Sequence, residues 1–255
     1  MQSLKGKQAL VTGASAGIGR ATALQLAQEG VNLTLVARRE NKLNELKKEL
    51  EKFNVKIDII LLDIRNRDKT FSTISEYLKN KDVDILINSA GLASGVDPIY
   101  AGSYDDWDKM IDTNIKGLLY ISKPIIEQMK KRNTGDIINL GSIAGIMTYP
   151  NGNVYCATKS AVHSISEGMN IDLQGTMVRV SNIAPGAIET EFSIVRYHGD
   201  TEKAKKVYEG YTPLSAEDIA DLIIYVLKAP AHVSIQHALI MPTVQRNPYI
   251  LNRQQ

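Results

Sequence analysis

Tyr155 and Lys159 lie four residues apart in a stretch with helical periodicity, so both side chains project from one face of the same helix. An ammonium group beside a phenol favours the phenolate and lowers the pKa of the phenol, as a general acid or base requires. Ser142 ends a strand-like run, Asp136–Ser142, and its hydroxyl can donate to a carbonyl oxygen. Alone, a Tyr–Lys pair is usually a surface feature, and a Ser after a strand is usually a cap. These residues therefore indicate a catalytic group only together with a second site.

A glycine-rich turn near the start of the chain supplies that second site. Thr12–Gly19 has the sequence TGASAGIG, after an apolar run and before a helix that we expect to begin near Ile18. Glycines let the backbone approach a pyrophosphate, and the free amides of a helix N-terminus attract its charge. A glycine triplet is weak evidence unless it lies between a strand and a helix, as it does here. The residues that we expect to bind the cofactor in this turn are Gly13, Ser15, Ala16, Gly17, Ile18 and Gly19.

The end of the second apolar run indicates which dinucleotide binds. An NAD site usually places a carboxylate there, on the ribose 2′-hydroxyl. This chain has Ala37 followed by Arg38 and Arg39. Without the carboxylate a 2′-phosphate is not repelled, and a guanidinium offers it planar donors. We predict NADP(H) rather than NAD(H); the alternative is two solvated arginines at a helix N-terminus.

The elements that must position these groups alternate along the chain. Strand-like runs span 8–12, 32–37, 55–62, 83–88, 136–141, 178–183 and 233–241, and helix-like stretches span 18–28, 40–53, 67–79, 104–132, 154–174 and 216–228. The strand runs are mostly continuous and apolar, as expected for strands covered on both faces. This alternation predicts right-handed βαβ crossovers. We expect a single doubly wound α/β domain over residues 1–255, with a seven-stranded parallel sheet flanked by helices on both faces.

One segment interrupts the alternation. Residues 187–213 are polar and irregular apart from a short helix-like piece at 201–208. Because ligands of open parallel sheets bind beyond the carboxyl ends of the strands, where this segment starts, we interpret it as a substrate lid. The alternative is a tolerated surface insertion.

Composition excludes several classes of function. The 30 Lys+Arg and 28 Asp+Glu leave a net charge of +2, which offers no field for nucleic acid or an anionic membrane. No apolar run approaches the roughly 18 residues that span a bilayer. A single cysteine, Cys156, excludes an internal disulfide and favours a cytoplasmic location. The four histidines lack metal-site spacing, so we expect no metal.

The whole set of motifs resembles the short-chain dehydrogenase/reductase family. Besides the turn, Ser142 and the Tyr–Lys pair, Asn88–Gly91, Asn114 and Pro185-Gly186 occur in that family's order and spacing. The likeness extends from about Lys7 to the last strand and implies a Rossmann fold.

The resemblance also implies roles for individual residues. Tyr155 would be the proton donor, with a pKa lowered by Lys159, which would also hold the nicotinamide ribose. Ser142 would position the substrate oxygen, and Asn114 would support a water relay behind Lys159. Further cofactor contacts are implied for Asp63, Ile64, Asn88, Ala90, Gly91, Pro185, Gly186, Ile188 and Thr190. Ser89 departs from the second Asn usual in the family, at a position that mainly stabilises the sheet in relatives, so we expect little effect on activity.

A closer likeness points to one branch of the family. The matching segments are Arg38-Arg39, 62–67, 90–93, 110–114, 152–155 and 190–196. That branch holds NADP-dependent 3-hydroxy acid dehydrogenases, which act on serine, allo-threonine and small 3-hydroxy acids, and malonic semialdehyde reductases. It implies a small-molecule substrate and a homotetramer.

Within that branch, Arg196 gains an expected role. A cation in the lid can pair with a substrate carboxylate, and the alternative is a surface arginine. Two other functions stay open: a carbonyl, keto-steroid or 3-oxoacyl reductase with the same apparatus, or a non-catalytic NADP-sensing protein.

Overall fold

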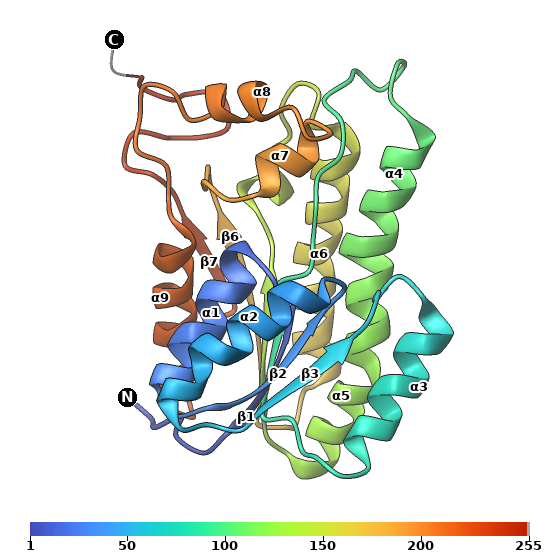
Figure 1. Cartoon of the computed structure of the whole chain (residues 1–255), viewed down its shortest axis with the longest axis vertical. Coiled ribbons are helices and arrows are strands. Elements are labelled where there is room, and N and C mark those ends of the chain that lie inside the picture. Colours follow the sequence, from blue (N-terminus) through green and yellow to red (C-terminus); the bar gives the residue numbers. More distant parts are fainter. Residues whose placement is uncertain (254–255) are drawn as a thin grey trace.

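The computed structural model describes residues 1–253 and places seven strands in one parallel sheet with helices on both faces (Figure 1). The strands are β1 (Gln8–Thr12), β2 (Asn32–Ala37), β3 (Ile57–Leu61), β4 (Ile85–Asn88), β5 (Gly135–Leu140), β6 (Val178–Pro185) and β7 (His237–Ile240). Their order across the sheet is β3-β2-β1-β4-β5-β6-β7. The doubly wound fold predicted from the alternating pattern is confirmed. The expected domain also included residues 254–255, which lie outside the described part.

The order of the strands creates a crevice at the carboxyl ends of β1 and β4. β1 pairs with β2 on one side and with β4 on the other, so successive crossovers leave β1 in opposite directions. Thr12, the last residue of β1, accepts hydrogen bonds at Oγ1 from the backbone N–H groups of Ser89 (3.1 Å) and Ala90 (3.0 Å). These bonds hold the loop after β4 against the loop after β1. Ligands of this fold bind at such a reversal point, beyond the carboxyl ends of the strands.

Helices cover both faces of the sheet (Figure 1). On one face lie α1 (Gly17–Gln28), α2 (Glu40–Leu50) and α9 (Ala216–Leu227), and on the other lie α3 (Arg67–Leu78), α5 (Leu118–Arg132) and α6 (Asn153–Asp172). A further helix, α4 (Tyr104–Ile111), packs against α6 beyond the carboxyl ends of the strands (Figure 1). Leu26 of α1 and Ile223 of α9 are buried on the first face, and Ile121 of α5 is buried on the second. Both sheet faces are therefore apolar, which explains the continuous apolar runs.

Several element boundaries differ from those expected. β7 begins at His237 rather than at 233, because its pairing with β6 starts where Asn182 meets His237. The helix expected over 40–53 ends at Leu50 and continues as a 3₁₀ turn, Glu51–Phe53, closed by Asn54 in the left-handed conformation (φ 54°). Such a left-handed cap ends a helix without a glycine when the residue is Asn.

The long helix expected over 104–132 is interrupted at its middle. A π-helical turn, η2 (Asp112–Gly117), separates α4 from α5 and contains Asn114. Single π turns insert a residue into a helix and are frequent at functional sites. Apolar periodicity does not reveal such a turn.

The segment 187–213, which we call the β6–α9 connection, lies over the carboxyl ends of the strands (Figure 1). It contains α7 (Phe192–Arg196) and α8 (Thr201–Lys206). A helix near α8 was expected, at 201–208, whereas α7 was missed because five residues are too few for a periodic pattern. Among residues 1–253, no helix combines the length and apolar character needed to cross a bilayer.

Candidate active site

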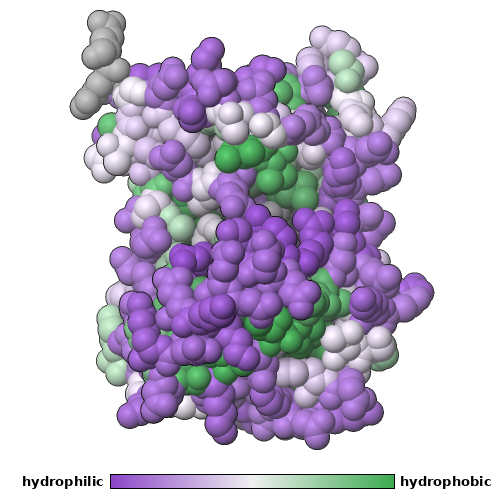
Figure 2. Space-filling model, in the orientation of Figure 1, coloured by the Kyte–Doolittle hydropathy of each residue, from purple (hydrophilic) through white to green (hydrophobic). Residues whose placement is uncertain are grey.

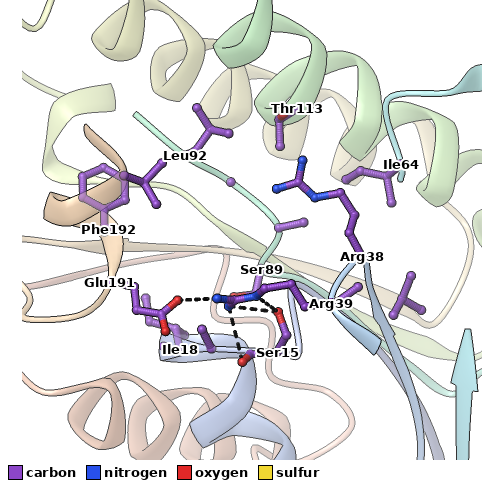
Figure 3. A pocket seen from close by; sticks show the side chains of 18 of the residues that line it. Ser15, Ile18, Arg38, Arg39, Ile64, Ser89, Leu92, Thr113, Glu191 and Phe192 are labelled. Atoms are coloured by element: carbon purple, nitrogen blue, oxygen red, sulfur yellow. Dashed lines mark hydrogen bonds and ion pairs between the residues drawn. The ribbon is translucent and has the colours of Figure 1, made fainter. Parts of the chain in front are cut away.

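A pocket of ≈ 320 Å³ opens at the reversal point between β1 and β4. The expected cofactor residues that line it are Gly13, Ser15, Ala16, Gly17, Ile18, Arg38, Arg39, Asp63, Ile64, Ala90, Gly91 and Thr190 (Figure 3). In the space-filling view, apolar surface lies at the level of α7 and a hydrophilic surface lies below it, over α2 (Figure 2). The sequence motifs, which are far apart in the chain, thus meet in one cavity.

The glycine turn has the geometry of a phosphate cradle. Gly13 has φ +65°, and a Cβ there would lie 2.9 Å from backbone atoms of Ala90. Gly17 begins α1 with φ +50°, and Ala16 before it caps the helix with no side-chain hydrogen bond. The first N–H groups of a 12-residue helix are therefore left for a ligand. These features fit the pyrophosphate of a dinucleotide.

Two expected cofactor residues, Gly19 and Asn88, line neither this pocket nor the one that adjoins it. Gly19 is buried beneath the turn, where a Cβ would lie 2.5 Å from the Gly13 carbonyl oxygen. The Asn88 side chain lies in the core, where its Nδ2 donates to Ser122 Oγ (2.9 Å) and Asn139 Oδ1 (2.8 Å). Gly19 therefore supports the glycine turn by close packing, and Asn88 supports the loop after β4 through its buried hydrogen bonds.

The two arginines after β2 have different surroundings (Figure 3). Arg39 Nη1 donates to Glu191 Oε2 at 2.8 Å, and its Nε donates to Ser15 Oγ at 3.2 Å. Within residues 1–253, the Arg38 guanidinium makes no hydrogen bond or ion pair, and it points into the pocket. Arg38 is therefore the cation that a 2′-phosphate would meet first.

Asp63, at the far wall of the same pocket, is held by its neighbour Arg65. Arg65 Nε lies 2.9 Å from Asp63 Oδ1, and these hydrogen bonds lower the pKa of the carboxyl group despite its partial burial. The carboxylate stays ionised and fixed, so it can accept a hydrogen bond from an amino group such as that of adenine.

A second pocket, of ≈ 340 Å³, adjoins the first beside Thr190 and Phe192. Ser142, Tyr155, Lys159, Arg196 and the expected Pro185, Gly186 and Ile188 all line it. A Cβ on Gly17 would lie 3.4 Å from the side chain of Thr190, so the β6–α9 connection faces the glycine turn across the opening. The predicted catalytic and cofactor residues therefore line one continuous site.

Ser142 is placed differently from expectation. β5 ends at Leu140, and Ser142 caps the 3₁₀ turn Ile143–Gly145, where its Oγ accepts from the Ala144 N–H at 3.1 Å. The strand expected to reach Ser142 is therefore too long by two residues. Because the hydroxyl oxygen is used as the acceptor, its hydrogen remains available to a ligand in the pocket.

Tyr155 and Lys159 are both buried on one face of α6, as the four-residue spacing predicted. Lys159 Nζ lies 5.9 Å from the centre of the Tyr155 ring and donates to the Leu140 carbonyl at 2.7 Å. Burial lowers the pKa of the Lys159 ammonium to about 8.

The pKa of the Tyr155 phenol departs from the expected direction. Burial, reinforced by Tyr149, raises this pKa above its ordinary value, and the opposing influences come from the Ser142 hydroxyl and from the charge of Arg196. Lys159 was expected to lower the pKa, but in this structure its Nζ is turned to the Leu140 carbonyl. Burial in this pocket therefore favours the protonated form of the phenol.

Both the oxygen and the nitrogen of the Asn114 carboxamide form hydrogen bonds beside the site. Its Oδ1 accepts from the Leu92 N–H (2.9 Å), and its Nδ2 donates to the Leu92 carbonyl (2.8 Å) and to Thr158 Oγ1 (3.0 Å). A Cβ on Gly91 would lie 3.3 Å from Asn114 Oδ1 and 3.4 Å from Lys159 Nζ. The π turn thus brings Asn114 close to Lys159 on the inner side of the pocket.

Arg196, at the end of α7, faces the same pocket as Tyr155. Its Nη1 donates to the Tyr149 hydroxyl at 3.0 Å, and its Nε is buried without a hydrogen-bond partner among the described residues. Sequence reasoning missed the other side chains of this wall, Tyr149, Phe192, Tyr208, Tyr211, Gln245 and Arg253. The aromatic residues within the β6–α9 connection were an available signal, whereas nothing local marked Tyr149 or Gln245.

No group of three or more His, Cys, Asp or Glu within residues 1–253 is arranged to hold a metal ion. His163 and His237 do meet edge to face, with ring centres 4.9 Å apart, beside Asn182.

Comparison with known proteins gives the same assignment. The sequence model of the short chain dehydrogenase family matches residues 7–200. The NADP-dependent 3-hydroxy acid dehydrogenase YdfG of Escherichia coli K12 is 43% identical over 242 residues, which cover 92% of this chain and 95% of the relative. Sulfoacetaldehyde reductase 2 of Chromohalobacter salexigens is 42% identical over 238 residues, covering 92% of this chain and 94% of the relative.

Among solved structures, the closed form of a serine dehydrogenase complexed with NADP⁺ superposes with a TM-score of 0.89 at 41% identity, covering 97% of this chain and 100% of the other. The glycine cradle, the free guanidinium of Arg38 and these relatives agree on the cofactor, which is NADP(H). The chain belongs to the short-chain dehydrogenase family and is an NADP-dependent oxidoreductase that acts on CH–OH groups.

Proposed function

We propose that the enzyme interconverts a small 3-hydroxy acid, such as serine or 3-hydroxypropionate, with the corresponding carbonyl compound. The observation that supports this substrate class is the position of Arg196. Its guanidinium lies in the pocket that contains Tyr155 and Ser142, and its Nε is buried without a partner in residues 1–253. A buried donor without an acceptor is costly, and a substrate carboxylate would satisfy it with a charge-assisted hydrogen bond.

The proposed reaction divides the work between cofactor and protein. NADP(H), when bound, supplies or accepts the hydride at the substrate carbon. In the direction of reduction, the Tyr155 hydroxyl donates its proton to the substrate oxygen, and the Ser142 hydroxyl orients that oxygen by a hydrogen bond. The raised pKa of Tyr155 keeps this proton in place until charge develops on the oxygen.

The remaining site residues support these two. Lys159 would bind the ribose beside the nicotinamide, and Thr190 with Ile188 would contact the carboxamide end of the cofactor. Asn114 fixes the loop at Leu92. Arg38 would bind the 2′-phosphate. The β6–α9 connection serves as the substrate lid, since it supplies Arg196 and most of the missed aromatic side chains.

We further propose that the enzyme is a cytoplasmic homotetramer. Support for self-association comes from β7, whose outer edge is unpaired among the described residues, and from exposed Tyr104 of α4 and Leu119 of α5. Size-exclusion chromatography with light scattering tests this directly. A monomeric mass would contradict it.

The substrate proposal is tested by following NADPH absorbance with purified enzyme. The panel contains L-serine, L-allo-threonine, 3-hydroxybutyrate and 3-hydroxypropionate, with malonic semialdehyde in the direction of reduction. Steroids, 3-oxoacyl thioesters and simple uncharged carbonyl compounds are assayed separately as alternative substrates. We expect the highest kcat/KM among the small 3-hydroxy acids. A preference for a steroid or thioester would reject the proposal, and NADPH binding with no turnover would indicate a sensor.

A further inference from the structure

The C-terminal end of α7 is joined to the loop after β4 and to α4 by two contacts. The Gly95 N–H donates to the Arg196 carbonyl oxygen at 3.0 Å. His198 Nε2 lies 3.2 Å from Asp106 Oδ2 on α4. Segments about 90 to 100 residues apart in the chain are thereby joined beside the pocket, and both contacts lie within two residues of Arg196.

Asp106 is suited to act as the fixed member of this pair. Its side chain is 8% exposed, although an ionised carboxylate is costly to bury without partners. Ser94 Oγ donates to its Oδ1 at 2.6 Å, and Lys109 Nζ lies 3.6 Å from the same oxygen. The carboxylate is therefore held in one orientation, with Oδ2 directed at His198.

The backbone at His198 ends α7. His198 has φ +53°, in the left-handed region, and Gly199 follows with φ +90°. The His198 N–H donates to the Val195 carbonyl oxygen at 3.2 Å and the Gly199 N–H to the Ile194 carbonyl oxygen at 2.8 Å, which is the hydrogen-bond pattern of a left-handed helix cap. The cap places the imidazole beside Asp106. The imidazole is more than half exposed, so apolar burial does not hold it there, whereas the contact with Asp106 does.

The Arg196 side chain depends on this placement. α7 has only five residues, so no long helix fixes its orientation. Phe192 packs against Tyr155 at the start of α7, with ring centres 5.5 Å apart, and the Asp106 pair holds the other end. Between these two points the Arg196 guanidinium reaches Tyr149 and the pocket.

We propose that His198 and Asp106 are positioning residues, which hold the end of α7 so that Arg196 meets the anionic group of the substrate. This rests on the proposed function, in which that group is a carboxylate. His198 acts through Arg196 and does not itself line the pocket. Loss of the pair is therefore expected to raise KM for an anionic substrate and to leave kcat and NADPH affinity nearly unchanged.

The test compares His198→Asn with His198→Lys and with His232→Asn. Asn tolerates the left-handed backbone but cannot reach Asp106, Lys supplies a donor with sufficient reach, and His232 is an exposed control between α9 and β7. We expect His198→Asn to raise KM for the 3-hydroxy acid about fivefold, the effect of losing a partly exposed contact between polar side chains. We expect His198→Lys and His232→Asn to stay near the wild-type KM.

Hydrogen–deuterium exchange provides a readout that needs no substrate. Peptides containing the Gly95 amide and residues 197–199 are expected to exchange faster in His198→Asn and in Asp106→Asn than in the wild type, and His198→Lys is expected to restore protection. Unchanged exchange would show that the contact between His198 and Asp106 does not hold the end of α7. Faster exchange with an unchanged KM would overturn the positioning role, and a raised KM without faster exchange would mean that His198 contacts substrate directly.

The two proposals fail in different ways. If wild-type enzyme turned over none of the hydroxy acids, the proposed function would be wrong. Exchange alone would then decide whether the contact between His198 and Asp106 holds the end of α7. If it turned them over and His198→Asn matched it in both KM and exchange, only the positioning role would be wrong.

Discussion

Arg39 Nη1 lies 2.8 Å from Glu191 Oε2, so the turn after β2 is joined to the residue that precedes α7 (Figure 3). Both side chains are about half exposed, and such pairs contribute only ~0.2–1 kcal/mol. The two arginines after β2 therefore differ in how available they are to bind a phosphate. Arg39 already has acceptors in Glu191 and Ser15, whereas Arg38 has none within the described residues.

The first prediction concerns the choice between NADPH and NADH. Replacing Arg38 by Ala should lower the ratio of kcat/KM for NADPH to that for NADH by about 10- to 100-fold, since hydrogen bonds to a charged group contribute ~1.5–3 kcal/mol. Arg39→Ala should change the ratio less, because that guanidinium is shared with the protein. The sequence alone does not distinguish which of the two arginines binds the 2′-phosphate. An Arg38→Ala enzyme with the wild-type ratio would refute the assignment.

The second prediction concerns the proton donor. Tyr155→Phe should lower kcat by about 10²–10⁴-fold, the usual contribution of a positioned general acid. The phenyl ring preserves the packing against Phe192, so Tm and NADPH affinity should stay close to wild type. Steady-state kinetics, thermal unfolding and NADPH fluorescence measure the three quantities. Retention of the wild-type kcat would remove Tyr155 from the mechanism.

The third prediction concerns the carboxylate contact. Arg196→Met should raise KM for a 3-hydroxy acid by about 10- to 100-fold, because a charge-assisted hydrogen bond is lost in a partly buried pocket. Turnover of an uncharged carbonyl substrate should not fall. Arg67→Met is a matched control, since Arg67 is exposed on α3 and, among residues 1–253, pairs only with Asp68. Equal KM values in the Arg196→Met and control enzymes would eliminate the carboxylate contact.

The fourth prediction concerns stability at alkaline pH. Burial lowers the pKa of Lys159 from 10.5 to about 8. Between these values the unfolded chain binds more protons than the folded chain, so the free energy of unfolding rises with pH. Raising the pH from below 8 to above 10.5 should therefore remove a burial penalty of up to about 3 kcal/mol.

The matching experiment is urea unfolding of wild type and Lys159→Met at pH 7 and pH 10. Groups that titrate in both proteins cancel in the difference, and only the wild type should show the additional gain at pH 10. An equal pH dependence in the two proteins would mean that the Lys159 ammonium is well solvated in the folded state.

The sequence by itself determined the fold class and predicted many of the residues that line the pocket between β1 and β4. The continuous apolar runs of β1, β2 and β4 predict strands buried on both faces, and the glycine turn lies at its required place after β1. Gly13 and Gly17 are recognisable because only glycine adopts their backbone conformations easily at such close approach. The four-residue spacing also determined that Tyr155 and Lys159 share a face of α6. Local periodicity and local backbone requirements suffice for these conclusions.

Only the tertiary structure decided which of the expected residues line the two pockets. Asn88 follows its motif in the sequence but is drawn into hydrogen bonds with Ser122 and Asn139, which come from other elements. Burial, reinforced by Tyr149, raises the pKa of Tyr155, and Ser142 and Arg196 oppose this rise. Lys159 instead donates to the Leu140 carbonyl. Burial, charge and hydrogen-bond partners arise from segments distant in the chain, and no local pattern encodes which partner a side chain finds once the sheet has assembled.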